Sequence, residues 1–266
     1  MKNLVWMVVG STVVVALVLG FGGAWLIERV REAAHAEQRQ TQLAGLQTFE
    51  ARGLATVTLR ANLADVRVHR DPGAAVRLAF VRLGVGQTEA EAKARAAAIR
   101  ITGKRDGATL AIEGHVPADG GPGALPALLA GAGHRLVLDL YLPAGAPTPA
   151  LDFDLEAGKI ALFATSGAPA KLHVGAGEIE AAGVVGDLAA TVGAGHIQLM
   201  GGRGRTKAAI DSGDIKLHGR TGPEAVLTAQ TGDLEWVFDR ALPAVSRLET
   251  QTGHVHLALA KDAGAA

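Results

Sequence analysis

Short apolar-polar-apolar segments recur through the C-terminal half of the chain. Each segment starts with a small residue and a glycine, and apolar residues stand two and four positions after that glycine. Period-two alternation is the pattern of a strand with one buried face, so a strand is predicted after each glycine. The glycines are 19, 18, 18, 19 and 21 residues apart. They are Gly158, Gly177, Gly195, Gly213, Gly232 and Gly253.

A second alternating strand is predicted before each glycine. In the first two repeats, Phe153 and Leu155 precede Gly158 as Leu172 and Val174 precede Gly177. The glycine is then the corner between two strands, where a positive φ is expected. Two strands in 18–21 residues predict one coil of a β-solenoid. The expected fold is therefore all-β: a two-sheet β-solenoid of about six coils over residues 151–260.

The alternative for this region is a set of antiparallel hairpins in a meander or a propeller. A propeller blade needs about 40 residues, which is twice the repeat length. A meander does not require the same residue class in the same column of every repeat. Residues 261–266 are expected to form a disordered tail.

Residues 49–150 predict a mixed β block without a clean repeat. Residues 55–59 and 65–68 alternate and are a candidate for a degenerate first coil. A short helix is predicted over residues 88–98, where Thr88 and Glu91 form a capping box. Because the end of a solenoid has unpaired backbone groups, this block is expected to cap the coils.

The N-terminal residues 4–27 form an uncharged run of 24 residues that follows a short tail, 1–3. As a helix, this run is about 36 Å long, enough for one transmembrane span. The alternative is a cleaved signal peptide, with Ala34-His35-Ala36 resembling a cleavage site. The apolar part of a signal peptide is usually about 7–15 residues, which favours the uncleaved anchor.

Basic residues flank the predicted span on both sides, so the positive-inside rule does not decide its orientation. A short tail before one long apolar run is typical of a signal-anchor, which places the C-terminal domain outside the cytoplasm. Residues 28–48 are free of proline and rich in Ala, Glu, Gln and Arg. They predict a juxtamembrane helical stalk.

Composition then excludes several classes of function. Among 266 residues, 26 are basic and 26 acidic, which gives no electrostatic reason to expect nucleic acid as a partner. The absence of cysteine excludes disulfides, cysteine nucleophiles and zinc sites with cysteine ligands. Aromatic residues make up 4% of the chain, which argues against stacking platforms for bases or sugars.

Residues with candidate chemistry are few. The position after each repeat glycine resembles the calcium-binding column of RTX repeats at Asp214 and Asp233. RTX repeats have period nine, however, and the column in this chain also contains two histidines and a lysine, which argues against calcium. His254 and His256 share an outward face and, with His218, are the candidates for a metal site. Two histidines without an evident carboxylate partner do not define one.

Asp152 and Asp154 also share an outward face, and nothing marks them as an acid-base pair rather than solvated side chains. We therefore expect no catalytic residue, no metal ligand and no cofactor. The six corner glycines are assigned a structural role only.

The repeats resemble the bacterial putative-adhesin family, a domain of unknown function with a β-solenoid fold. The resemblance lies in the Ser212-Gly213-Asp214-Ile215-Lys216-Leu217 and Thr231-Gly232-Asp233-Leu234-Glu235-Trp236 units. The Leu140-Tyr141-Leu142-Pro143-Ala144-Gly145 segment resembles the family's entry into the repeats. His196 and His254 in place of Asp, and the helix at 88–98, depart from the family pattern.

Together with the predicted span and the absence of a catalytic motif, this resemblance implies a non-catalytic, membrane-anchored β-solenoid protein of the bacterial cell envelope, acting as an adhesin-like or scaffold surface. Its expected partners are the membrane, through a single span, and an envelope protein or polysaccharide. One alternative is a cytoplasmic-facing, polymerising scaffold of the bactofilin kind. Another is a carbohydrate-active β-helix enzyme. The sequence leaves the oligomeric state open.

Overall fold

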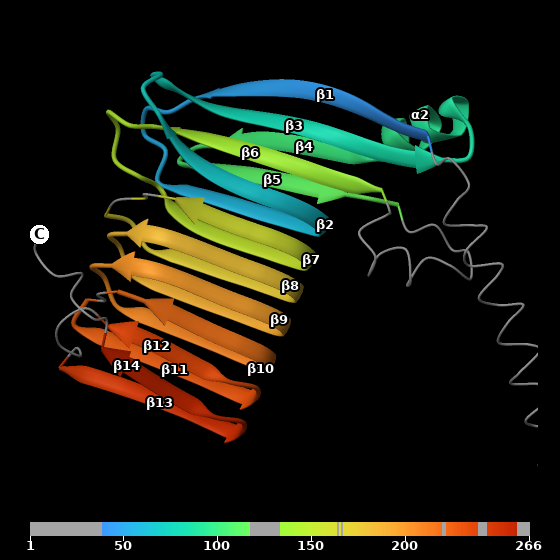
Figure 1. Cartoon of the computed structure of the whole chain (residues 1–266). Helices are drawn as coiled ribbons and strands as arrows, with labels where there is room; N and C mark the ends of the chain where they lie inside the picture. The colour runs from blue at the N-terminus through green and yellow to red at the C-terminus, as the bar shows by residue number, and fades with distance from the viewer. Residues whose placement is uncertain are drawn as a thin grey trace, which may run out of the picture.

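The computed structural model describes residues 39–117, 134–163, 165, 167–219, 222–238 and 244–259. Over this part the chain is nearly all β, with one short helix and fourteen strands that belong to one hydrogen-bonded sheet (Figure 1). The elements are β1 (Arg39–Glu50), β2 (Thr56–Asp71), β3 (Ala75–Gly86), α2 (Glu89–Ala98), β4 (Arg100–Asp106), β5 (Thr109–His115), β6 (Arg135–Pro143), β7 (Ala150–Phe163), β8 (Ala170–Val184), β9 (Leu188–Gly202), β10 (Thr206–His218), β11 (Glu224–Thr231), β12 (Leu234–Phe238), β13 (Val245–Thr252) and β14 (Val255–Leu259).

Consecutive repeats lie side by side as parallel neighbours. Gly158, Gly177, Gly195 and Gly213 pair in register along β7 to β10, and the residues on both sides of them keep that register. The first half of β10 then pairs with β11 and its second half with β12. In the last coil, β13 pairs with β11 and β14 pairs with β12. Each repeat is thus one coil of a stack, as the sequence predicted (Figure 1).

Each coil has two arms that meet at the corner glycine: the first arm precedes the glycine and the second arm follows it. Two strands separated by a turn were predicted for every coil. The structure has separate strands only in the last two coils, because β7 to β10 run through the glycine without interruption. The two predicted sheets are therefore the two arms of one bent sheet.

The hydrophobic core lies between the two arms. Alternate side chains of the first arm are buried, among them Phe153 at 0% and Leu172 at 1% exposure. The second arm buries the aliphatic residue two positions after each of the first five corner glycines. These residues are Ile160, Ile179, Ile197, Ile215 and Leu234. Since each buried side chain adds apolar area removed from water, the repeated columns stabilise the stack along its whole length.

The corner glycines are required by the close approach of successive coils. All six have a positive φ, between 126° and 144°. A Cβ at Gly177, for example, would collide with the carbonyl oxygen of Gly158 one coil earlier. A side chain is therefore opposed both by the backbone conformation and by the neighbouring coil.

The N-terminal part of the structure contains a further coil. β2 pairs in parallel with both arms of β7, so residues 56–71 are the first coil that the sequence suggested. On its other side β2 divides, pairing with β5 along the first arm and with β6 along the second arm. β4 then extends the first arm, while β3 and β1 extend the second arm, all three in antiparallel pairing.

The helix α2 forms where the capping box predicted it. Thr88 is the N-cap, and its hydroxyl oxygen accepts a hydrogen bond from the Glu91 backbone N–H at 3.2 Å. Ala92 and Ala96 are fully buried. Both lie against Gly84, where a Cβ would collide with the helix backbone. Small residues on both sides thus allow the helix to pack directly on β3.

The prediction of a helical stalk is wrong over residues 39–48, which belong to β1. Every residue of β1 pairs with β3, and alternate residues are half-buried. Helix propensity is a weak preference of a few tenths of a kcal/mol per residue, and twelve paired residues outweigh it. The β-rich block therefore begins at Arg39 or before it, rather than at residue 49.

The predicted transmembrane helix at 4–27, the remainder of the stalk and the tail at 261–266 lie outside the described residues. Among the helices that the structure does describe, none has the length and apolar character needed to cross a membrane.

Candidate functional site

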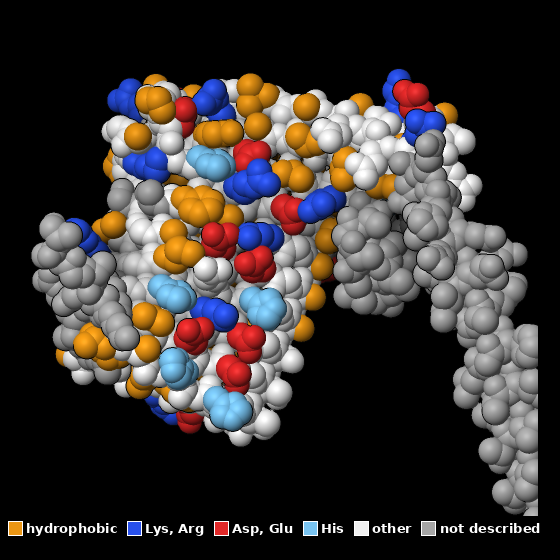
Figure 2. Space-filling view, viewed as in Figure 1, with side chains coloured by type: hydrophobic (Ala, Val, Ile, Leu, Met, Phe, Trp, Pro, Cys, Tyr) orange, Lys and Arg blue, Asp and Glu red, His pale blue; other side chains and the backbone are white. Residues whose placement is uncertain are grey.

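The second arms carry a continuous strip of charged and histidine side chains, which we call the charged face. It comprises the outward polar residues one and three positions after each corner, where backbone pairing aligns them from coil to coil. Figure 2 shows acidic, basic and histidine side chains intermingled over this side of the stack. Its members are Asp65, Arg67, Lys159, Glu178, Glu180, His196, Gln198, Asp214, Lys216, Asp233, Glu235, His254 and His256.

Ion pairs between neighbouring coils connect this strip. The Lys159 ammonium lies 2.9 Å from a Glu180 carboxylate oxygen and 3.1 Å from one of Glu178. These two carboxylates, Glu180 first, raise the pKa of Lys159 above its ordinary value of 10.5. Lys216 pairs at 3.7 Å with Glu235, which stands in the same column of the next coil.

Two histidines of the charged face pair with aspartates on the adjacent coil. His196 Nδ1 lies 3.7 Å from an Asp214 oxygen, and His254 Nδ1 lies 3.3 Å from Asp233 Oδ1. The His254 backbone N–H also donates to Asp233 Oδ1 at 2.8 Å. That backbone hydrogen bond is the main cause that lowers the pKa of Asp233 below 3.8.

The charged face continues into the N-terminal strands. Asp65 lies opposite Lys159 in the register and forms an ion pair with Arg135 at 2.7 Å. Beside it, His69 Nε2 lies 3.1 Å from an Asp139 oxygen, and the imidazole stacks on Tyr141 with ring centroids 5.1 Å apart. These residues could not be assigned to the charged face from the sequence, because only the alignment of β2 with β7 brings them next to the repeats.

The face carries six carboxylates against three Lys or Arg side chains, together with three histidines. It is therefore acidic when the histidines are neutral and close to balanced when they are protonated.

The histidines singled out as metal candidates are not brought together in one cluster. His254 contacts Asp233, whereas His256 lies beside Glu235 in the next column. His218 pairs with Val237, which in turn pairs with Ala258 of the last coil. Within the described residues there is no group of three or more His, Cys, Asp or Glu side chains arranged to hold a metal ion.

Asp152 and Asp154 lie on the outside of the first arm, and Arg60 joins them. Its guanidinium is 3.4 Å from an oxygen of each aspartate. All three side chains are at least one-third exposed, so the pairs contribute little to stability. Arg60 could not be assigned to this pair from the sequence, because it is about ninety residues away along the chain.

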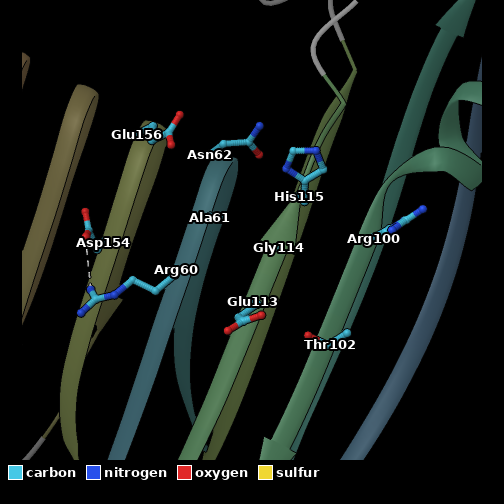
Figure 3. A pocket seen from close by; sticks show the side chains of 10 residues that line it. All are labelled: Arg60, Ala61, Asn62, Arg100, Thr102, Glu113, Gly114, His115, Asp154 and Glu156. Atoms are coloured by element: carbon cyan, nitrogen blue, oxygen red, sulfur yellow. Dashed lines mark ion pairs between the residues drawn. The ribbon is translucent and has the colours of Figure 1, made fainter.

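A shallow hollow of about 460 Å³ lies next to this pair, where β5 and β4 extend the first arm beyond β2 (Figure 3). Figure 3 shows the Arg60 side chain directed toward Asp154, with Asn62 and His115 at one end of the hollow. Its polar groups come from four strands. The lining residues are Arg60, Ala61, Asn62, Arg100, Thr102, Glu113, Gly114, His115, Asp154 and Glu156.

The two regions differ in what they can do chemically. The charged face is broad and regular, so it suits many separate contacts with an extended partner. The hollow offers hydrogen-bond donors and acceptors of mixed charge to one small polar group. Asn62 is not free for such a ligand, because its amide forms two hydrogen bonds with the Val116 backbone.

Comparisons with known proteins return solved structures alone: no family model and no curated protein matches the chain. A putative cell adhesion protein from Clostridium sporogenes aligns at 11% identity with a TM-score of 0.45, covering 82% of this chain and 100% of that one. A putative adhesin from Bacteroides fragilis aligns at 9% identity with a TM-score of 0.35, covering 81% and 97%. One from Parabacteroides merdae aligns at 10% identity with a TM-score of 0.25, covering 80% and 95%. All three are bacterial proteins, and their names are consistent with the family that the repeats resemble.

Proposed function

We propose that the chain is a non-catalytic, adhesin-like binding protein of the bacterial cell envelope, and that the charged face is its binding surface. The observation that carries this proposal is the regular spacing of charged groups of both signs along the second arms of all the coils. Any one exposed charge contributes little. An extended partner that meets many of them at once gains from their combined effect.

A partner that follows the stack must itself be extended, such as an envelope polysaccharide or an elongated segment of an envelope protein. The side chains of the face project in parallel from backbone-paired strands, whereas catalysis needs several groups that converge on one reacting atom. This geometry favours binding over turnover. The excess of carboxylates further favours a partner that carries positive charge or many hydroxyl groups.

The apolar run at 4–27 supports a single-span anchor, and we place the described domain outside the cytoplasm. Protease added to spheroplasts that express the chain should therefore digest the domain. Digestion only after lysis would reverse the orientation and favour a cytoplasmic scaffold.

Binding is tested with two double variants that remove equal charge from the two arms. Glu178→Gln/Glu235→Gln neutralises part of the charged face, and Asp152→Asn/Asp154→Asn is the matched control on the first arm. The full chain in membranes is incubated with purified cell-wall polysaccharide and with an envelope protein fraction, and retention is measured against salt concentration. The first variant should lose at least about tenfold in affinity, roughly 1.4 kcal/mol, while the control keeps it.

If the control loses binding instead, the hollow beside Arg60, rather than the charged face, is the binding site. If neither variant changes retention, electrostatic binding by this domain is excluded. A polymerising scaffold is less well supported, because antiparallel β1, β3 and β4 interrupt the parallel register at the N-terminal end of the stack.

A further inference from the structure

The C-terminal end of the stack leaves its core open. Leu257 stands in the same column as Trp236 and Leu217, yet it is 47% exposed while they are at 0% and 1%. Val255, in the column of fully buried Leu234, is 43% exposed. Within the described residues, the last coil therefore keeps the apolar residues of the core, and no further coil covers them.

The same end also presents two free strand edges. Among the described strands, β13 pairs only with β11 and β14 pairs only with β12. The inward positions of β13 and β14 carry no charge and no proline, the features by which proteins usually protect an edge. An unpaired edge beside exposed apolar side chains can bind another strand, through backbone hydrogen bonds and apolar contacts.

The opposite end of the stack is closed differently. Arg105 of β4 donates hydrogen bonds to the backbone oxygens of Glu50 and Arg52, so its side chain ties the end of one arm to the other. Gln47 of β1 also takes an inward position there. Only the C-terminal end combines open apolar columns with free edges in the described part of the chain.

We propose that this end binds a second copy of the same chain, end to end, about a two-fold axis perpendicular to the stack. Such an axis exchanges the two arms, so that β13 of one copy lies antiparallel to β14 of the other. We align the two copies so that their corners, at Thr252 and Gly253, lie over each other. Residue 248 of one copy then lies opposite residue 257 of the other, and every such pair of residue numbers sums to 505. Two such pairings form at once, and they use both free edges.

This register is self-complementary. Inward residues meet inward residues, with Leu248 opposite Leu257 and Thr250 opposite Val255 of the second copy. On the outer side, Glu249 lies opposite His256, and each pair occurs twice. A carboxylate opposite an imidazole and leucine opposite leucine are favourable cross-strand pairs. A shift by one residue would place inward positions opposite outward ones. Because Arg105 links the two arms at the N-terminal end, that end offers no open core to a further copy, and the assembly stops at a dimer.

Disulfide trapping tests this register, because the chain has no cysteine of its own. Glu249 and His256 point outward on different arms, so cysteines there cannot pair within one chain. Glu249→Cys/His256→Cys in the full chain, oxidised in native membranes, should give a covalent dimer that a reductant reverses. Each single variant should give none. Thr228→Cys/Glu235→Cys is the matched control, since these residues occupy the same columns one coil earlier, where the copies are too far apart to bridge.

Sedimentation of the detergent-solubilised full chain gives a second measurement. The wild type should show a concentration-dependent dimer, and Leu257→Lys, which places a charge in the apolar contact, should be monomeric. Val185→Lys, at an exposed valine away from this end, should remain dimeric. The proposal is overturned by a wild-type monomer at all concentrations, by equal trapping of the control pair, or by a ladder of higher oligomers. None of these measurements depends on the ligand of the charged face.

Discussion

The side chain of Asn62 and the backbone of Val116 form a two-bond amide pair across 54 residues of sequence. Asn62 Nδ2 donates to the Val116 carbonyl oxygen at 2.7 Å, and the Val116 N–H donates to Asn62 Oδ1 at 2.9 Å. Asn62 lies two residues before Ala64, which pairs with the corner glycine Gly158, and Val116 directly follows β5. The pair therefore fixes where β5 leaves the stack and satisfies two backbone groups that no strand pairs.

Asn62→Ala should destabilise the fold by about 1–3 kcal/mol, because it leaves the Val116 N–H and carbonyl without partners in a region where Val116 is only 4% exposed. Denaturant unfolding of the protein measures the change. Asn62→Asp keeps the acceptor for the Val116 N–H and loses the donor to the Val116 carbonyl. Its loss of unfolding free energy should therefore be smaller than that of the alanine variant. Equal losses would mean that only one of the two hydrogen bonds matters.

Much of the coil architecture could be predicted because burial within a coil follows from local alternation. Ile215 and Leu217, for example, alternate with Lys216, and the structure buries the first two and exposes the third. Each coil rests on a neighbour with the same pattern, so one repeat predicts the environment of the next. The continuity of β7 to β10 through the corner glycines could not be predicted, because it depends on backbone pairing near the corner.

The N-terminal strands were harder to predict because their partners are not repeats. Residues 39–48 have helix-forming side chains, and only their pairing with β3 makes them a strand. The same limit applies to the charged face. Lys159 could be placed on the surface by its column, but its contacts with Glu178 and Glu180 require the register between β7 and β8. Arg60 beside Asp152 requires the long-range pairing of β2 with β7.

The corner glycines provide a test of stacking. Gly213→Ala should cost more than about 3 kcal/mol, because a Cβ there adopts a strained φ of 127° and also collides with the Gly195 carbonyl oxygen. Gly167→Ala is the control, since Gly167 has a φ of 91° but no atom within 4 Å of the added Cβ. It should cost about 1–3 kcal/mol from strain alone. Equal losses in thermal or denaturant unfolding would show that contact between coils is not what excludes a side chain.

The contact between α2 and β3 is tested at Gly84. Gly84→Val should destabilise the protein by about 1–3 kcal/mol, since the new side chain overlaps the backbone of Ala92 and Ala96 and must displace the helix. Amide hydrogen exchange in α2 should become faster while exchange in β8 and β9 stays slow. Gly145→Val, at a glycine with open space around its Cα, should change the stability by less than about 0.5 kcal/mol. Uniformly faster exchange would mean that the helix and the coils unfold as one unit.

The Lys159 ion pairs make a pH-dependent contribution to stability. Because the folded pKa of Lys159 lies above its ordinary value of 10.5, the stabilisation is fully present below pH 10.5 and is lost as the pH rises through the folded pKa. Lys159→Met should therefore be less stable than the wild type near pH 8, by less than about 1 kcal/mol for a pair so accessible to solvent. The difference in unfolding free energy should shrink above pH 10.5 and in high salt. Lys171→Met, which removes an exposed lysine from the outside of the first arm, is the control. A difference between Lys159→Met and the wild type that stays constant as the pH rises would assign the effect to packing of the lysine stem rather than to its charge.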